Sequence, residues 1–153
     1  MSRNSKVLNG IGLAAVLLVL VFAVGVAFAG NRGAPRVTTL SGAEEAPGPG
    51  DPDGSGFASI RLNVGQERVC WQISYENIGE PRAAHIHKAP AGSPGGVVVP
   101  LLDPSISSGC TAADGALIQD IIDYPDQYYV NVHTAEHPAG AIRGQLSNPG
   151  QSK

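Results

Sequence analysis

Charged and aromatic side chains are both scarce in this chain. Only 15% of its 153 residues are charged, and 5% are Phe, Trp or Tyr. Its 10 Lys and Arg residues are outnumbered by 13 Asp and Glu residues, which gives a formal net charge of −3. Nucleic-acid binding requires a basic stripe, and attraction to anionic lipids requires a basic patch. The composition therefore excludes nucleic acid as a partner and predicts no electrostatic attraction to membranes.

Common catalytic motifs are also missing. The chain has no G-x-S-x-G elbow, no H-E-x-x-H motif and no glycine-rich loop between a strand and a helix. Asp51 and Asp53 alternate as in a calcium loop, but no glutamate completes that loop and no helices flank it. No catalytic residue is predicted, and calcium is disfavoured.

A long hydrophobic run occurs only at the N-terminus. Residues 11–29 carry no charge, follow Arg3 and Lys6, and end in Ala-Phe-Ala, a sequence typical of signal-peptidase sites. A run of this length can also span a bilayer. Residues 1–29 are therefore either a cleaved signal peptide, which we favour, or a membrane anchor. Both place the remaining chain outside the cytoplasm, because the basic end stays inside.

Cysteine is limited to Cys70 and Cys110. An even number of cysteines in an exported chain indicates one disulfide. The two are far apart in sequence, and no cationic partner that would favour redox chemistry is apparent. The sequence therefore predicts a structural disulfide between Cys70 and Cys110.

Glycine and proline are abundant, with 20 and 12 residues, and they separate short apolar segments. Apolar residues recur at every second position in most of these segments, which is the pattern of β-strands. Strands are expected at residues 37–40, 57–64, 68–75, 84–88, 97–102, 128–133 and 142–146.

Only residues 114–123 show helical spacing, with Asp114 as a cap and Pro125 beyond the end. We therefore predict an all-β domain, an antiparallel β-sandwich or flattened Greek-key barrel with one short helix. Residues 30–36 are predicted to be a linker, 37–147 the domain and 148–153 a C-terminal tail.

Three of the four histidines lie on predicted strands. His85 and His87 share one face of an extended segment because they are two residues apart. His133 joins them only if its strand pairs with theirs in the right register, since a one-residue slip would turn it away. Three neutral imidazoles suit copper or zinc. His85, His87 and His133 are therefore the predicted metal ligands.

The three histidines need neighbouring groups to orient their rings, whether or not they bind a metal. Carboxylates that orient ligand imidazoles could come from Asp103, Asp126 or Glu136. The alternative to metal binding is a structural role, in which the imidazoles hydrogen-bond to neighbouring backbone or carboxylates. Both interpretations stay open at the level of sequence.

The segments AAHIHKAPAGSPGGVVVPL and YYVNVHTAEHPAGAIRGQL resemble the CHRD domain, named after chordin and common in secreted bacterial proteins. The likeness runs from about residue 37 to 146. It implies an extracytoplasmic binding or structural module whose ligand lies outside the cell or in the cell envelope. His137 is outside the pattern and is expected to be an exposed turn residue.

The His-x-His strand is also similar to one in copper-zinc superoxide dismutase. This likeness covers a tripeptide and an architecture, and the full set of copper ligands and a bridging histidine are not found. A metal-dependent oxidoreductase is therefore the alternative to a binding module. Arg143 faces away from Ile142 and Leu146, and we predict that it is a structural anchor and not a catalytic group.

Overall fold

The computed structural model describes residues 33–102 and 106–151. The predicted leader, most of the predicted linker and the last two residues lie outside this range. The strands are β1 (Ala34–Ser41), β2 (Ser55–Asn63), β3 (Arg68–Glu76), β4 (Pro81–Lys88), β5 (Gly96–Pro100), β6 (Ser108–Ala112), β7 (Tyr128–Thr134) and β8 (Ile142–Gln145). One α-helix, α1 (Gly115–Asp123), and three short 3₁₀ turns complete the described elements.

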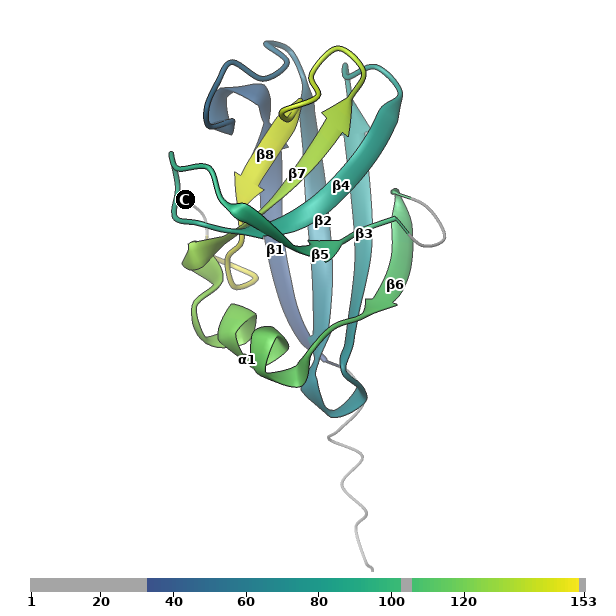
Figure 1. The fold of residues 1–153 in the computed structure, drawn as a ribbon, viewed down its shortest axis with the longest axis vertical. Helices are drawn as coiled ribbons and strands as arrows, with labels where there is room; N and C mark the ends of the chain where they lie inside the picture. The colour runs from purple at the N-terminus through teal and green to yellow at the C-terminus, as the bar shows by residue number, and fades with distance from the viewer. Residues whose placement is uncertain (1–32, 103–105, 152–153) are drawn as a thin grey trace, which may run out of the picture.

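The eight strands form one antiparallel sheet in the order β5-β4-β7-β8-β1-β2-β3-β6. The sheet rolls into a flattened, nearly closed barrel, in which β4, β5 and β7 lie in front of β1, β2 and β3 (Figure 1). This confirms the predicted all-β class. β1 begins at Ala34, inside the segment predicted as linker, because residues 34–36 pair with β2. β6 was not predicted, because its sequence SGCTA lacks apolar alternation.

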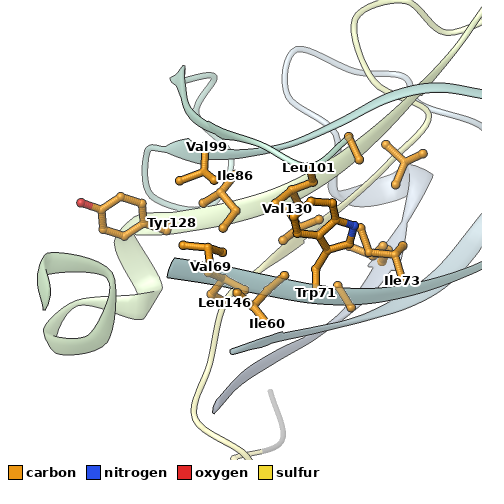
Figure 2. Packing of buried hydrophobic residues seen from close by; sticks show 14 of the residues in the cluster. Ile60, Val69, Trp71, Ile73, Ile86, Val99, Leu101, Tyr128, Val130 and Leu146 are labelled. Carbon is orange, nitrogen blue, oxygen red and sulfur yellow. The ribbon is translucent and has the colours of Figure 1, made fainter. Parts of the chain in front are cut away.

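Alternation along the strands fills the interior of the barrel. Figure 2 shows Val69 and Trp71 of β3 on one side of the core and Ile86 of β4 on the other. Val69 and Ile86 are fully buried, and Trp71 Nε1 donates a hydrogen bond to Ile106 O at 3.0 Å. A fully buried aliphatic side chain of this size contributes about 1.5–3 kcal/mol. The core therefore holds the two halves of the sheet together.

Helix α1 covers one end of the barrel (Figure 1). The side chain of Asp114 caps it by accepting hydrogen bonds from the backbone amides of Ala116 and Leu117. Ile118 and Ile121 are fully buried against the core. The helix has 9 residues and ends before Pro125, as the sequence predicts. No helix within the described residues is long and apolar enough to cross a membrane.

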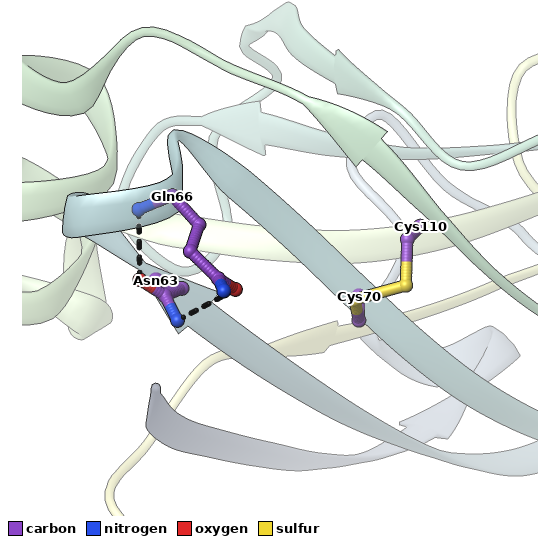
Figure 3. The surroundings of a disulfide bond; sticks show 4 residues. All are labelled: Asn63, Gln66, Cys70 and Cys110. Atoms are coloured by element: carbon purple, nitrogen blue, oxygen red, sulfur yellow. Dashed lines mark hydrogen bonds between the residues drawn. A yellow bond between two sulfur atoms is a disulfide. The ribbon is translucent and has the colours of Figure 1, made fainter. Parts of the chain in front are cut away.

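Cys70 and Cys110 form a disulfide on the outer face of the sheet (Figure 3). They stand directly opposite each other in the register of β3 and β6. Figure 3 also shows the turn between β2 and β3, where Asn63 accepts a hydrogen bond from the backbone amide of Gln66 at 3.0 Å. The disulfide ties the edge strand β6 to its neighbour.

Candidate metal centre

The register of β4 and β7 brings the three predicted ligands together. Ala83 pairs with His133, His85 with Asn131, and His87 with Tyr129. Residues that are opposite in an antiparallel pair share a face, so all three imidazoles lie on the outer side of the sheet. One nitrogen from each of His85, His87 and His133 lies within 4.8 Å of the other two. We refer to these residues as the histidine trio.

Backbone carbonyls orient two members of the trio. His87 Nδ1 lies 2.9 Å from Gly95 O, and His133 Nδ1 lies 3.1 Å from Pro138 O. Because a carbonyl oxygen only accepts, both Nδ1 atoms carry the proton and both Nε2 atoms keep a lone pair. These carbonyls fill the role expected for the carboxylates of Asp126 or Glu136. Asp103 lies outside the described residues.

The spacing of His85 and His133 suits a shared ion. His85 Nδ1 lies 3.1 Å from His133 Nε2, so a proton on His85 Nδ1 donates to the lone pair of His133. Two nitrogen ligands of a tetrahedral zinc ion, each about 2.0–2.1 Å from the metal, lie about 3.3 Å apart. An ion can therefore replace this proton with little movement of either ring.

Burial keeps the trio neutral. It is the main cause that lowers the pKa of His85 to about 4, and the neighbouring His133 and His87 lower it further. Burial also lowers the pKa of His133, against the hydrogen bond to Pro138. It lowers the pKa of His87 in the same way, against the hydrogen bond to Gly95 and the influence of the Asn131 side chain. All three imidazoles are thus neutral at neutral pH, and each keeps one ring nitrogen free of a proton, as metal ligation requires.

One ring nitrogen of the trio is buried without a partner. His87 is 7% exposed, and its Nε2 has no hydrogen bond among the described residues. Buried polar atoms in native proteins nearly always have a partner, so an orphan needs an explanation. A cation bound between the three imidazoles would supply such a partner.

A second layer of polar side chains supports the site. Arg143, which is 1% exposed, donates to Ser93 O at 2.9 Å and to Pro90 O at 3.1 Å. Its guanidinium carbon lies 3.4 Å from the centre of the Tyr129 ring. The Tyr129 ring stacks on His87, with centroids 4.8 Å apart. These contacts hold residues 89–95, which carry the Gly95 carbonyl, against the outer face of the sheet.

His137 is not part of the centre. Its imidazole is half-buried, with Nε2 3.6 Å from a carboxylate oxygen of Asp51. The expectation of an exposed turn residue is wrong, because the loop that carries Asp51 folds over this turn and bonds to Ala141. Sequence reasoning also missed two buried residues, Asn131, which lies opposite His85 in the strand register, and Glu45, which interacts with Asn131. Asn131 shares the strand period of His133, but Glu45 comes from a loop with no periodic signal.

The match to known families covers this whole arrangement. The family model of the CHRD domain matches residues 36–146. The chain belongs to the CHRD domain family. No curated protein and no solved structure matches it. In this CHRD domain the matched segment contains the histidine trio, the disulfide and Arg143.

Proposed function

We propose that this CHRD domain is an extracytoplasmic binding module that holds one copper or zinc ion through His85, His87 and His133. The observation that carries the proposal is the convergence of three neutral imidazoles, with ligand atoms within 4.8 Å of one another. Hydrogen bonding to backbone accounts for one nitrogen each of His87 and His133. It does not account for the buried Nε2 of His87.

Ligand type sets the choice of metal. Imidazole nitrogens favour borderline ions such as Zn²⁺ and Cu²⁺, whereas Ca²⁺ and Mg²⁺ require several oxygens in one cage. The trio offers nitrogen only. Copper or zinc is therefore the expected ion.

The location is proposed from two features. The CHRD family and the disulfide both fit an oxidising compartment outside the cytoplasm. We propose residues 1–29 as a signal peptide or membrane anchor, residues 37–147 as the domain and residues 148–153 as its tail. Mass analysis of the exported protein distinguishes cleavage from retention, because only cleavage removes the mass of residues 1–29.

Binding is preferred over an oxidoreductase resembling copper-zinc superoxide dismutase. Within the described residues the trio is the one group of His, Cys or carboxylate ligands with metal-binding geometry, so a second subsite has no support. Arg143 donates to loop carbonyls and is not directed at an open channel. These two observations support binding over turnover.

The test is metal analysis of protein exported under metal-replete conditions, followed by titration of the metal-free form. Wild type should carry stoichiometric copper or zinc. His87→Ala and His133→Ala should lose it, because each removes one of three ligands. His137→Ala is the matched control and should retain the metal, because His137 contacts Asp51 and lies outside the trio.

Failure of wild type to retain either metal at micromolar concentration would overturn the proposal. Superoxide dismutation by the purified protein, abolished in His85→Ala, would instead establish the oxidoreductase. The two assays use the same proteins and separate the two functions.

A further inference from the structure

Asn131 carries a second buried acceptor beside the trio. Its side chain is 2% exposed, and its Oδ1 has no hydrogen-bond partner among the described residues. Asn131 stands opposite His85 in the strand register and lies between Tyr129 and His133 on the same face of β7. Buried acceptors in native proteins nearly always have a hydrogen-bond partner or a ligand. The orphaned Oδ1 therefore indicates a partner that the described protein atoms do not supply.

Glu45 determines which way the amide of Asn131 points. The Asn131 side chain hydrogen-bonds to the Glu45 carboxyl and so favours its ionised form, which lowers the pKa of Glu45 against the effect of burial. In its ionised form the carboxylate only accepts, so the Nδ2 of Asn131 donates to it, in agreement with Oδ1 being the amide atom that has no partner among the described residues. The Oδ1 atom then points away from Glu45.

The Oδ1 atom of Asn131 is turned toward His87 instead. The side chain of Asn131 favours the protonated form of His87 and raises its pKa, as an acceptor turned toward the ring does. His87 Nδ1 already donates to Gly95 O, which leaves Nε2 as a lone pair. Nε2 and Oδ1 are thus two buried acceptors without partners. A proton on Nε2 would donate to Oδ1 and give both atoms a partner. Burial disfavours this, because the second proton turns His87 into a charged imidazolium.

We propose that Asn131 Oδ1 is the fourth ligand of the ion held by His85, His87 and His133, which makes the centre a closed site of three nitrogens and one oxygen. This inference rests on the proposed metal binding by the trio. Four protein ligands are typical of zinc sites that hold the ion without catalysis, whereas catalytic sites keep one position for water. An oxygen ligand also favours Zn²⁺ or Cu²⁺ over Cu⁺, which prefers sulfur.

The test uses the full exported protein, stripped of metal and titrated with Zn²⁺ and with Co²⁺ at about pH 8, where Glu45 is ionised. Asn131→Leu has similar size but no donor oxygen. Its Zn²⁺ affinity should fall by about tenfold or more. Its Co²⁺ spectrum should change in the visible region, because water replaces the amide. His137→Ala should leave both unchanged.

A swapped double variant, Asn131→Asp with Glu45→Gln, tests the ligand independently of packing. It exchanges the two groups, so the amide introduced at position 45 donates to the carboxylate introduced at position 131. The second oxygen of that carboxylate then faces His87. Tight Zn²⁺ binding and a four-coordinate Co²⁺ spectrum should return. This variant also carries the test if Asn131→Leu does not fold.

The outcomes separate the two proposals. If wild type binds Zn²⁺, and a folded Asn131→Leu binds it equally well with the same Co²⁺ spectrum, Asn131 is not a ligand and the trio stands. Weak binding by a folded swapped variant would likewise overturn the fourth ligand. If wild type binds no metal, the trio proposal fails first and this inference fails with it.

Discussion

His85 sets the response of the metal-free centre to acid. Its pKa is about 4 in the folded protein, against 6.5 for an ordinary histidine, because of burial and the nearby His133 and His87. Between these values the unfolded chain binds more protons than the folded one. Stability from this group is therefore fully present above about pH 6.5 and is lost as the pH falls toward 4. His87 and His133 act in the same direction.

His85→Gln should weaken this dependence. We expect the loss of free energy of unfolding between pH 6.5 and pH 4.5 to be smaller in the variant than in wild type. Urea denaturation of the metal-free proteins at both pH values measures it. Equal losses in the two proteins would show that His85 is protonated in the folded state as easily as in the unfolded state.

Glu45 acts with the opposite sign. Burial raises its pKa to about 7, from an ordinary value of 4.5, while Arg143, the backbone amide of Ala46 and the side chain of Asn131 favour the charged form and limit the rise. The folded state therefore binds the extra proton. The stability from this group is fully present below about pH 4.5 and is lost as the pH rises through 7.

Glu45→Gln should remove that loss. In wild type the contribution of Glu45 to the free energy of unfolding declines between pH 5 and pH 8, and in the variant this decline should be absent. Urea denaturation of the metal-free proteins over this range checks it. Glu44→Gln is the matched control, because it removes a carboxyl group from the exposed neighbouring residue and leaves the buried Glu45 in place. A profile unaltered by Glu45→Gln would contradict the assignment.

At the level of elements, the loop between β4 and β5 depends on side chains from β7 and β8. Arg143 donates to Pro90 and Ser93, Gln145 donates to Ala89 O at 2.7 Å, and the hydroxyl of Tyr129 accepts from the Gly95 amide at 3.1 Å. This loop supplies the carbonyl that orients His87. Arg143 therefore affects the proposed ion indirectly, because it positions the loop whose Gly95 carbonyl orients His87.

Arg143→Lys should loosen this loop, because one ammonium group cannot reproduce the two directed bonds of the guanidinium. Hydrogen bonds to a charged donor contribute about 1.5–3 kcal/mol each, so we expect a destabilisation of about 2 kcal/mol or more. Hydrogen exchange should show faster exchange of the Gly95 amide, and Zn²⁺ affinity should fall. Arg82→Lys is the control, because Arg82 is exposed. Unchanged exchange at Gly95 would contradict the anchoring role.

At the scale of the whole molecule, the disulfide links two strands that are far apart in the chain. Cys70 and Cys110 are 40 residues apart, and the segment between them contains β4 and β5. A loop of this length reduces the entropy of the unfolded chain by an amount worth about 4 kcal/mol. β6 is an edge strand whose one described strand partner is β3.

Cys70→Ser with Cys110→Ser should therefore lower the free energy of unfolding by about 4 kcal/mol. Exchange of the β6 amides should rise more than exchange of the β2 amides. Denaturation and hydrogen exchange measure these effects, and mass spectrometry of wild type should show the loss of two hydrogen atoms on oxidation. Equal protection of β6 in the variant and wild type would show that pairing alone holds this edge.

The sequence by itself determined what depends on near neighbours in the chain. Alternation along residues 57–64 and 128–133 predicts strands, and Asp114 with Pro125 marks the ends of the helix, because side-chain direction and capping follow from local backbone geometry. The shared face of His85 and His87 follows from the same rule. β6 escaped prediction because its residues carry no apolar period, and pairing with β3 selects its conformation.

The tertiary structure decided what depends on contacts between distant segments. The register of β4 against β7 places His133 beside His85, and a slip of one residue would have turned it away. Glu45 reaches Asn131 from a loop, and Arg143 reaches Pro90 and Ser93 across the sheet. Residue types restrict which ions such a site can hold, but the buried acceptors of His87 and Asn131, which have no partner among the described residues, share one face of the sheet only because β4 pairs with β7 in this register.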